Sequence, residues 1–70
     1  MANTRFNEYI GRAIPLSLSR AMKTYNVSPS DFSDLEEVYG QDDAAIEAAI
    51  KQYSPNGQFS VFEFWNRRPL

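Results

Sequence analysis

The sequence predicts a small, mainly α domain: four short helices followed by an extended or β C-terminal segment, or an α+β domain if that segment joins a sheet. Two observations predict this class. Apolar residues recur at the spacing i, i+3, i+4, i+7 along most of the chain, and capping or turn residues separate the periodic stretches. The last stretch, 58–65, is instead crowded with aromatic residues and favours an extended strand.

Length and composition limit how such a domain can be stabilised. Its 70 residues predict one domain, 1–70, near the size below which a hydrophobic core alone seldom stabilises a fold. The chain has no Cys and no His, so neither a disulfide nor a structural zinc site is expected. A hydrophobic fraction of 43% argues against intrinsic disorder. Close helix packing, a homodimer or docking on a partner are the remaining sources of stability.

A first helix is expected over 4–13. Pro15 ends it, because the residue before a proline favours extended conformations, and Gly11 weakens it. A strand over 5–10 is the alternative. The apolar residues at helical spacing are Phe6, Tyr9, Ile10 and Ala13.

A second helix is expected between Ser17 and Asn26. Ser17 is the predicted N-cap, and Asn26 tolerates the left-handed conformation with which helices often end. The apolar face of this helix consists of Leu18, Ala21, Met22 and Tyr25.

The third helix, over 29–39, has the clearest boundaries in the sequence. Ser28 suits the N-cap, Pro29 the first helical position and Asp31 the position from which a carboxylate reaches back to the cap. Gly40 ends the helix. The predicted apolar contacts comprise a hydrophobic staple of Val27 with Phe32 and a buried stripe that continues through Leu35, Val38 and Tyr39.

A fourth helix follows, with Asp42 as its cap and Asp43 at its first position, where negative charge meets the positive end of the helix dipole. The turn residues of 54–57 stop it. Its inner face is expected to contain Ala45, Ile46, Ala49, Ile50 and Tyr53.

The predicted C-terminal strand needs a partner, because a single strand cannot satisfy its own backbone groups. It would pair with residues within 4–18, with its copy in a dimer or with another protein; failing these, it would pack as an irregular apolar tail.

The charges are distributed unevenly. The net charge is only −2, yet no Lys or Arg lies between Lys23 and Lys51, and that stretch holds seven of the nine acidic residues. The two helices expected there would carry these acids on their outer surface. Such a distribution bears on the choice of partner rather than on the fold.

Catalytic chemistry has little support in this composition. Without His and Cys, the commonest general base, the thiolate nucleophile and most transition-metal ligands are missing, and the three isolated glycines form no phosphate-binding loop. We therefore expect no enzyme, no cofactor and no metal. No apolar stretch approaches the roughly 18 residues of a membrane span, and no secretory signal is recognisable, so a soluble, cytoplasmic protein without a membrane partner is expected.

The leading hypothesis is a small non-catalytic protein-binding regulator or inhibitor that presents an acidic helical surface to a basic groove on a larger partner. Carboxylates at helical spacing can imitate the phosphates of nucleic acid. Trp65 is included because it stands beside Arg67 and Arg68, and both residue types are enriched at interface hot spots. The predicted binding residues are Asp31, Asp34, Glu36, Glu37, Asp42, Asp43, Glu47 and Trp65.

Other interpretations of the same residues stay open. The acids can be ordinary solvated helix faces and caps, and the C-terminal aromatic residues can complete a small core. Small acidic proteins without catalytic residues are frequent among phage and mobile-element inhibitors of host machinery, which is an association of class and not a shared motif.

A nucleic-acid-binding protein is the main alternative function, and a structural accessory subunit is the second. Residues 18–36 loosely resemble a helix-turn-helix, but phosphates would repel the acidic second helix. Nucleic acid is therefore the weaker expectation for a partner. A DNA-binding version would have to use Arg5, Arg12, Arg20 and Lys23.

Overall fold

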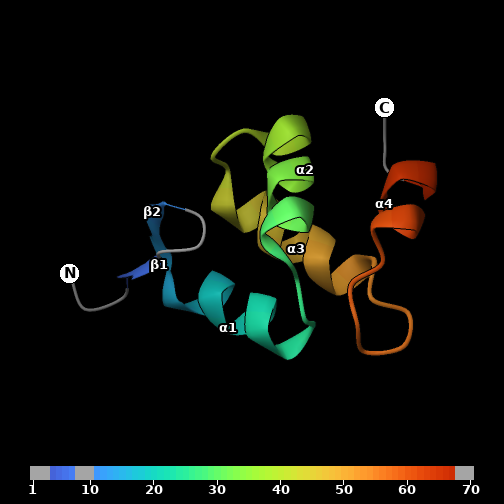
Figure 1. Cartoon of the computed structure of the whole chain (residues 1–70), viewed down its shortest axis with the longest axis horizontal. Coiled ribbons are helices and arrows are strands. Elements are labelled where there is room, and N and C mark those ends of the chain that lie inside the picture. Colours follow the sequence, from blue (N-terminus) through green and yellow to red (C-terminus); the bar gives the residue numbers. More distant parts are fainter. Residues whose placement is uncertain (1–3, 8–10, 68–70) are drawn as a thin grey trace.

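The computed structural model describes residues 4–7 and 11–67, and this part of the chain is mainly helical, as predicted. Four helices and two short strands follow one another along it (Figure 1). Their bounds are β1 Thr4–Asn7, β2 Arg12–Pro15, α1 Leu16–Thr24, α2 Pro29–Tyr39, α3 Asp43–Gln52 and α4 Val61–Arg67. The number of helices agrees with the prediction, but the first predicted helix is absent and the last observed helix was predicted as a strand.

The helix predicted over 4–13 is wrong, because β1 and β2 form an antiparallel hairpin with Thr4 opposite Pro15 and Asn7 opposite Arg12. Gly11 adopts a positive φ of 74°, which interrupts helical geometry. Burial in β2 has the alternation of a strand, with Ile14 buried and Ala13 exposed. The alternative strand over 5–10 coincides with β1 in part, and residues 8–10 lie outside the described chain.

Helix α1 begins directly after β2, so the predicted N-cap is wrong. Pro15 occupies the cap position and makes no side-chain cap bond, while the Ser17 hydroxyl is used elsewhere. Asn26 has a φ of 56° in the turn after the helix, which confirms the left-handed conformation predicted there. Leu18, Ala21 and Met22 are buried in the core cluster.

Helices α2 and α3 are confirmed at the predicted bounds and caps. The Asp31 backbone N–H donates to the Ser28 hydroxyl at 3.1 Å, and the Ser28 N–H donates back to the Asp31 carboxylate at 3.5 Å. Asp42 caps α3 by accepting from the Ala45 N–H at 3.2 Å. Gly40, with a φ of 65°, ends α2 as predicted.

The strand predicted over 58–65 is wrong, since Val61–Arg67 is helix α4. Ser60 begins it by accepting from the Glu63 N–H at 3.2 Å. The preceding loop needs no sheet partner, because the Phe59 N–H donates to the Tyr25 carbonyl at 2.8 Å and the Ser60 N–H donates to the Tyr53 carbonyl at 2.9 Å. These two bonds satisfy the backbone N–H groups of the loop without a neighbouring strand.

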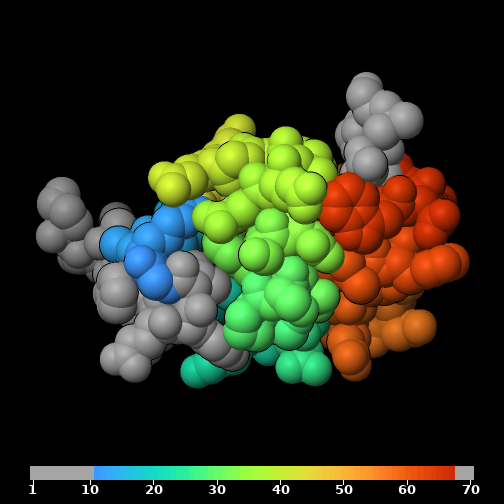
Figure 2. All heavy atoms as spheres, turned by 45° about the horizontal axis from the view of Figure 1, so that its top comes forward, coloured from blue at the N-terminus to red at the C-terminus, as the bar shows by residue number. Residues whose placement is uncertain are grey.

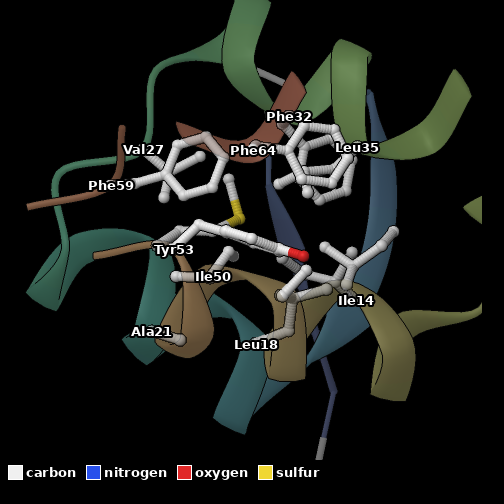
Figure 3. Packing of buried hydrophobic residues seen from close by; sticks show 13 residues of the cluster. Ile14, Leu18, Ala21, Val27, Phe32, Leu35, Ile50, Tyr53, Phe59 and Phe64 are labelled. Atoms are coloured by element: carbon white, nitrogen blue, oxygen red, sulfur yellow. The ribbon is translucent and has the colours of Figure 1, made fainter. Parts of the chain in front are cut away.

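One buried cluster gathers apolar side chains from β2, the loops and all four helices of the described chain (Figure 3). Phe64 of α4 is fully buried in it, and its ring packs against those of Tyr53 at 5.5 Å and Phe59 at 6.1 Å between centroids. Helix α4 therefore closes one side of the core. The hairpin lies at the opposite end of the molecule (Figure 1).

Candidate protein-binding surface

Arg12 of β2 places its guanidinium beside acidic residues of the segment between Lys23 and Lys51, which contains no Lys or Arg. Its Nε donates to Glu36 Oε2 at 2.8 Å, and its Nη2 and Nη1 donate to the two oxygens of Asp43 at 2.8 and 3.2 Å. The guanidinium also lies 5.5 Å from the centroid of the Phe32 ring. The hydrogen bond to Asp43 raises the pKa of Arg12, and the bond to Glu36 adds to this shift. Two of the predicted binding residues, Glu36 and Asp43, thus hold the hairpin against α2 and α3.

Glu47 is also engaged within the chain. Its carboxylate accepts from the Ser17 hydroxyl at 2.8 Å and from Lys51 Nζ at 3.1 Å. The Ser17 bond, followed by the Lys51 bond, lowers the pKa of Glu47, so this carboxyl stays ionised at lower pH than an ordinary glutamate. Glu47 therefore links α1 to α3 and stabilises their contact.

The Asp31 and Asp42 carboxylates lie at helix starts, where they accept from the backbone N–H groups of Ser28 and Ala45 rather than from cations. At these positions the positive end of the helix dipole compensates negative charge.

Three carboxylates remain without an ion pair to any described residue along one side of α2. Asp31, Asp34 and Glu37 follow the spacing i, i+3, i+6, which keeps them on neighbouring turns of the same helix side. Glu37 is exposed, and Asp34 accepts from the indole Nε1 of Trp65 at 3.3 Å. We call these three residues the acidic ridge. The predicted acidic surface therefore divides into the ridge, the α3 cap and a set of structural ion pairs.

Two aromatic side chains are exposed on α4 beside this region. Phe62 is 71% exposed and Trp65 is 37% exposed, and their i, i+3 spacing places them on one side of the helix. We call them the aromatic pair. In the space-filling view, atoms of α4 directly border those of α2, which forms the centre of that face (Figure 2).

Phe62 was not among the predicted binding residues. The signal that could have found it is Ser60-Val61-Phe62-Glu63, the S-x-x-E pattern of a helix start. A helix beginning there puts Val61 and Phe64 on one side and Phe62 and Trp65 on another, whereas a strand would have placed Phe62 and Phe64 on the same face.

A shallow depression of about 230 Å³ lies on the other side of α4, between that helix and the end of α3. Its two charged side chains, Glu63 and Arg67, pair with each other at 3.2 Å, and the Tyr53 hydroxyl donates to the Arg67 carbonyl at 3.2 Å. The ion pair lies within α4, and the Tyr53 hydrogen bond joins this helix to the end of α3.

Two searches of the described residues concern other classes of site. Residues 4–7 and 11–67 contain no group of three or more acidic side chains arranged to hold a metal ion. No helix in the same part of the chain is long and apolar enough to cross a membrane.

Compared with models of known families, with curated proteins and with solved structures, the chain matches none.

Proposed function

We propose that this chain is a small non-catalytic protein-binding regulator or inhibitor that presents the acidic ridge of α2 to a basic site on a larger protein. The observation that carries the proposal is the ridge itself: three carboxylates on one side of a helix, none in an ion pair with a described residue. The surrounding segment contains no Lys or Arg between Lys23 and Lys51.

Electrostatics favour a basic partner for such a ridge. Like charges one turn apart repel one another and destabilise an isolated helix by a few tenths of a kcal/mol per pair. A surface of Lys and Arg would relieve that repulsion on binding and would steer the encounter from a distance. The carboxylates rise about 4.5 Å from one to the next along the helix axis, against about 3.4 Å per phosphate along one DNA strand. A groove that normally binds nucleic acid is the basic site we expect.

We place nucleic-acid binding second. It would depend on four cations of the N-terminal third, of which Arg12 is already bound to Glu36 and Asp43. The second helix of the resembled motif, α2, carries the acidic ridge, which phosphates would repel.

The test must leave the structural carboxylates intact. Charge reversal at Glu36 or Asp43 would break the Arg12 contacts, and reversal at Asp42 would remove the cap of α3. The double variant Asp34→Asn/Glu37→Gln instead raises the net charge by two without touching these bonds.

The matched control is Thr24→Lys/Asn56→Lys, which raises the net charge by the same two units at exposed positions outside α2. Each tagged protein is used as bait in a nuclease-treated extract of the native source, with bound proteins quantified by mass spectrometry. We expect one stoichiometric protein partner on the wild-type and control baits, reduced at least about tenfold on the ridge variant. Equal capture by all three baits, or capture that occurs only in a parallel extract without nuclease, would contradict the proposal.

A further inference from the structure

We infer that the aromatic pair, Phe62 and Trp65, is the apolar anchor of this binding surface, and that the partner's site is a protein pocket lined by apolar side chains and rimmed by Lys and Arg. The inference rests on the proposed function and adds the anchor and the chemistry of the pocket that receives it.

Helix α4 is apolar on two sides, although the core uses only one of them. Phe64 is fully buried and Val61 packs against the core, whereas Phe62 is 71% exposed. The Tyr39, Tyr53 and Phe59 rings around Phe64 complete the core contact without Phe62. Phe62 therefore contributes apolar surface that the described fold leaves exposed, whereas Trp65 packs on Phe64 at 5.2 Å between ring centroids and keeps 37% of its surface exposed.

The aromatic pair and the acidic ridge form one surface. The Trp65 indole N–H donates to the Asp34 carboxylate at 3.3 Å, which fixes an aromatic ring beside the middle residue of the ridge. Figure 2 shows α2 and α4 meeting without a gap on this face. A partner that covers Phe62 and Trp65 must therefore also approach Asp34. Large aromatic side chains surrounded by polar groups are typical of interface hot spots.

Charge complementarity selects the occupant. Nucleic-acid phosphates and acidic proteins would be repelled by the ridge. A second copy would bring an identical ridge to the same place, because a two-fold contact joins the same patch of both subunits. Arg12, Lys51 and Arg67 are already paired with carboxylates of their own chain, and Arg20 and Lys23 belong to α1 rather than to the helices that form this surface. A different protein with an apolar pocket surrounded by Lys and Arg complements both the aromatic pair and the acidic ridge.

Site-specific photocrosslinking in cells of the native source tests the anchor. The probe is p-benzoylphenylalanine, introduced by Phe62→p-benzoylphenylalanine in the full chain, with Thr24→p-benzoylphenylalanine on α1 as the control. We expect a protein adduct at position 62 at least about tenfold more abundant than at position 24, and strongly reduced when Asp34→Asn/Glu37→Gln is added. Mapping of the adduct should place the attachment site in an apolar pocket with Lys or Arg at its rim.

The other outcomes separate the inference from the proposed function. An adduct with a second copy of this chain, with nucleic acid, or at a partner surface without basic residues overturns the inference. So does the absence of an adduct at position 62 while the wild-type bait still captures a ridge-dependent partner, a result that leaves the proposed function standing. If no bait captures a protein and no adduct forms, both fail. Circular dichroism of each variant establishes that it is folded.

Discussion

Arg12 connects three elements of the described chain. It belongs to β2, yet its guanidinium contacts Glu36 of α2, Asp43 of α3 and the ring of Phe32. Its side chain is only 20% exposed, so these bonds are less screened by water than those of a surface pair. Because its three bonds have the planar fork geometry of a guanidinium, a lysine cannot reproduce them.

Substituting Arg12 should therefore destabilise the protein more than substituting any exposed ion-pair cation. We expect Arg12→Met to lower the free energy of unfolding by about 1 to 2 kcal/mol, because two carboxylates lose charge-assisted hydrogen bonds that are partly shielded from solvent. Arg12→Lys should recover part of the loss. Urea denaturation followed by circular dichroism measures the difference.

Lys51→Met is the matched control, because its i, i+4 pair with Glu47 is well exposed and should contribute less than about 0.5 kcal/mol. If Arg12→Met and Lys51→Met lower the free energy of unfolding equally, the Arg12 contacts are ordinary surface pairs and do not stabilise the packing of the hairpin on α2 and α3.

The contacts of Arg12 could not be predicted from the sequence, although other features of the charged residues could. The uneven distribution of charge was visible in the sequence, and so was the role of Asp31, Asp42 and Asp43 at helix starts, because capping is local. The pairing of Arg12 with residues 24 and 31 positions away depends on the hairpin that brings them together. Without the hairpin, the sequence gives no indication that Glu36 and Asp43 bind Arg12.

At the scale of elements, the predictions that succeeded were those determined by neighbouring residues. The bounds of α2 follow from Ser28, Pro29, Asp31 and Gly40, each of which acts within one turn. The two elements that were predicted wrongly are segments whose apolar pattern and residue propensities point in different directions. Over 4–13 the apolar residues have helical spacing, but Gly11 and Pro15 disfavour a helix and the segment forms a hairpin. Over 58–65, high strand propensity concealed the helix start at Ser60, because propensity for β structure depends strongly on context.

The capping box gives α2 its defined start, and its removal should be measurable. Ser28→Ala deletes the acceptor of the Asp31 N–H and should lower the free energy of unfolding by about 1 kcal/mol. The control is Ser33→Ala, at an exposed position in the interior of the same helix, where alanine is a better helix former and should cost nothing. Thermal and urea denaturation of both variants give the comparison. Equal destabilisation by the two would show that the cap bond contributes nothing of its own.

For the molecule as a whole, the small size of the core makes the contribution of helix α4 to stability important. A chain of 70 residues has a small core, and domains of this size are near the lower limit of independent stability. Helix α4 adds Phe64 to that core, and the ring packs against Trp65 at 5.2 Å and Tyr39 at 6.1 Å between centroids as well as against residues of the loop before it. The same helix carries Phe62 outward. Phe64 and Phe62 therefore serve stability and the proposed binding from different sides of one seven-residue helix, and Trp65, which packs on Phe64, contributes to both.

This division predicts that two phenylalanines two positions apart will behave in opposite ways. Phe64→Ala should lower the free energy of unfolding by about 3 to 5 kcal/mol, through lost burial and the cavity left behind, which is most of the stability of a small domain. Phe62→Ala should change it by less than about 0.5 kcal/mol, because an exposed ring has little burial to lose. Urea denaturation distinguishes the two, and near-ultraviolet circular dichroism reports whether the aromatic core stays ordered.

If Phe62→Ala lowered the free energy of unfolding as much as Phe64→Ala, Phe62 would belong to the core in solution and could not serve as an anchor. If Phe62→Ala folds normally but loses the ridge-dependent partner, its exposure is explained by binding.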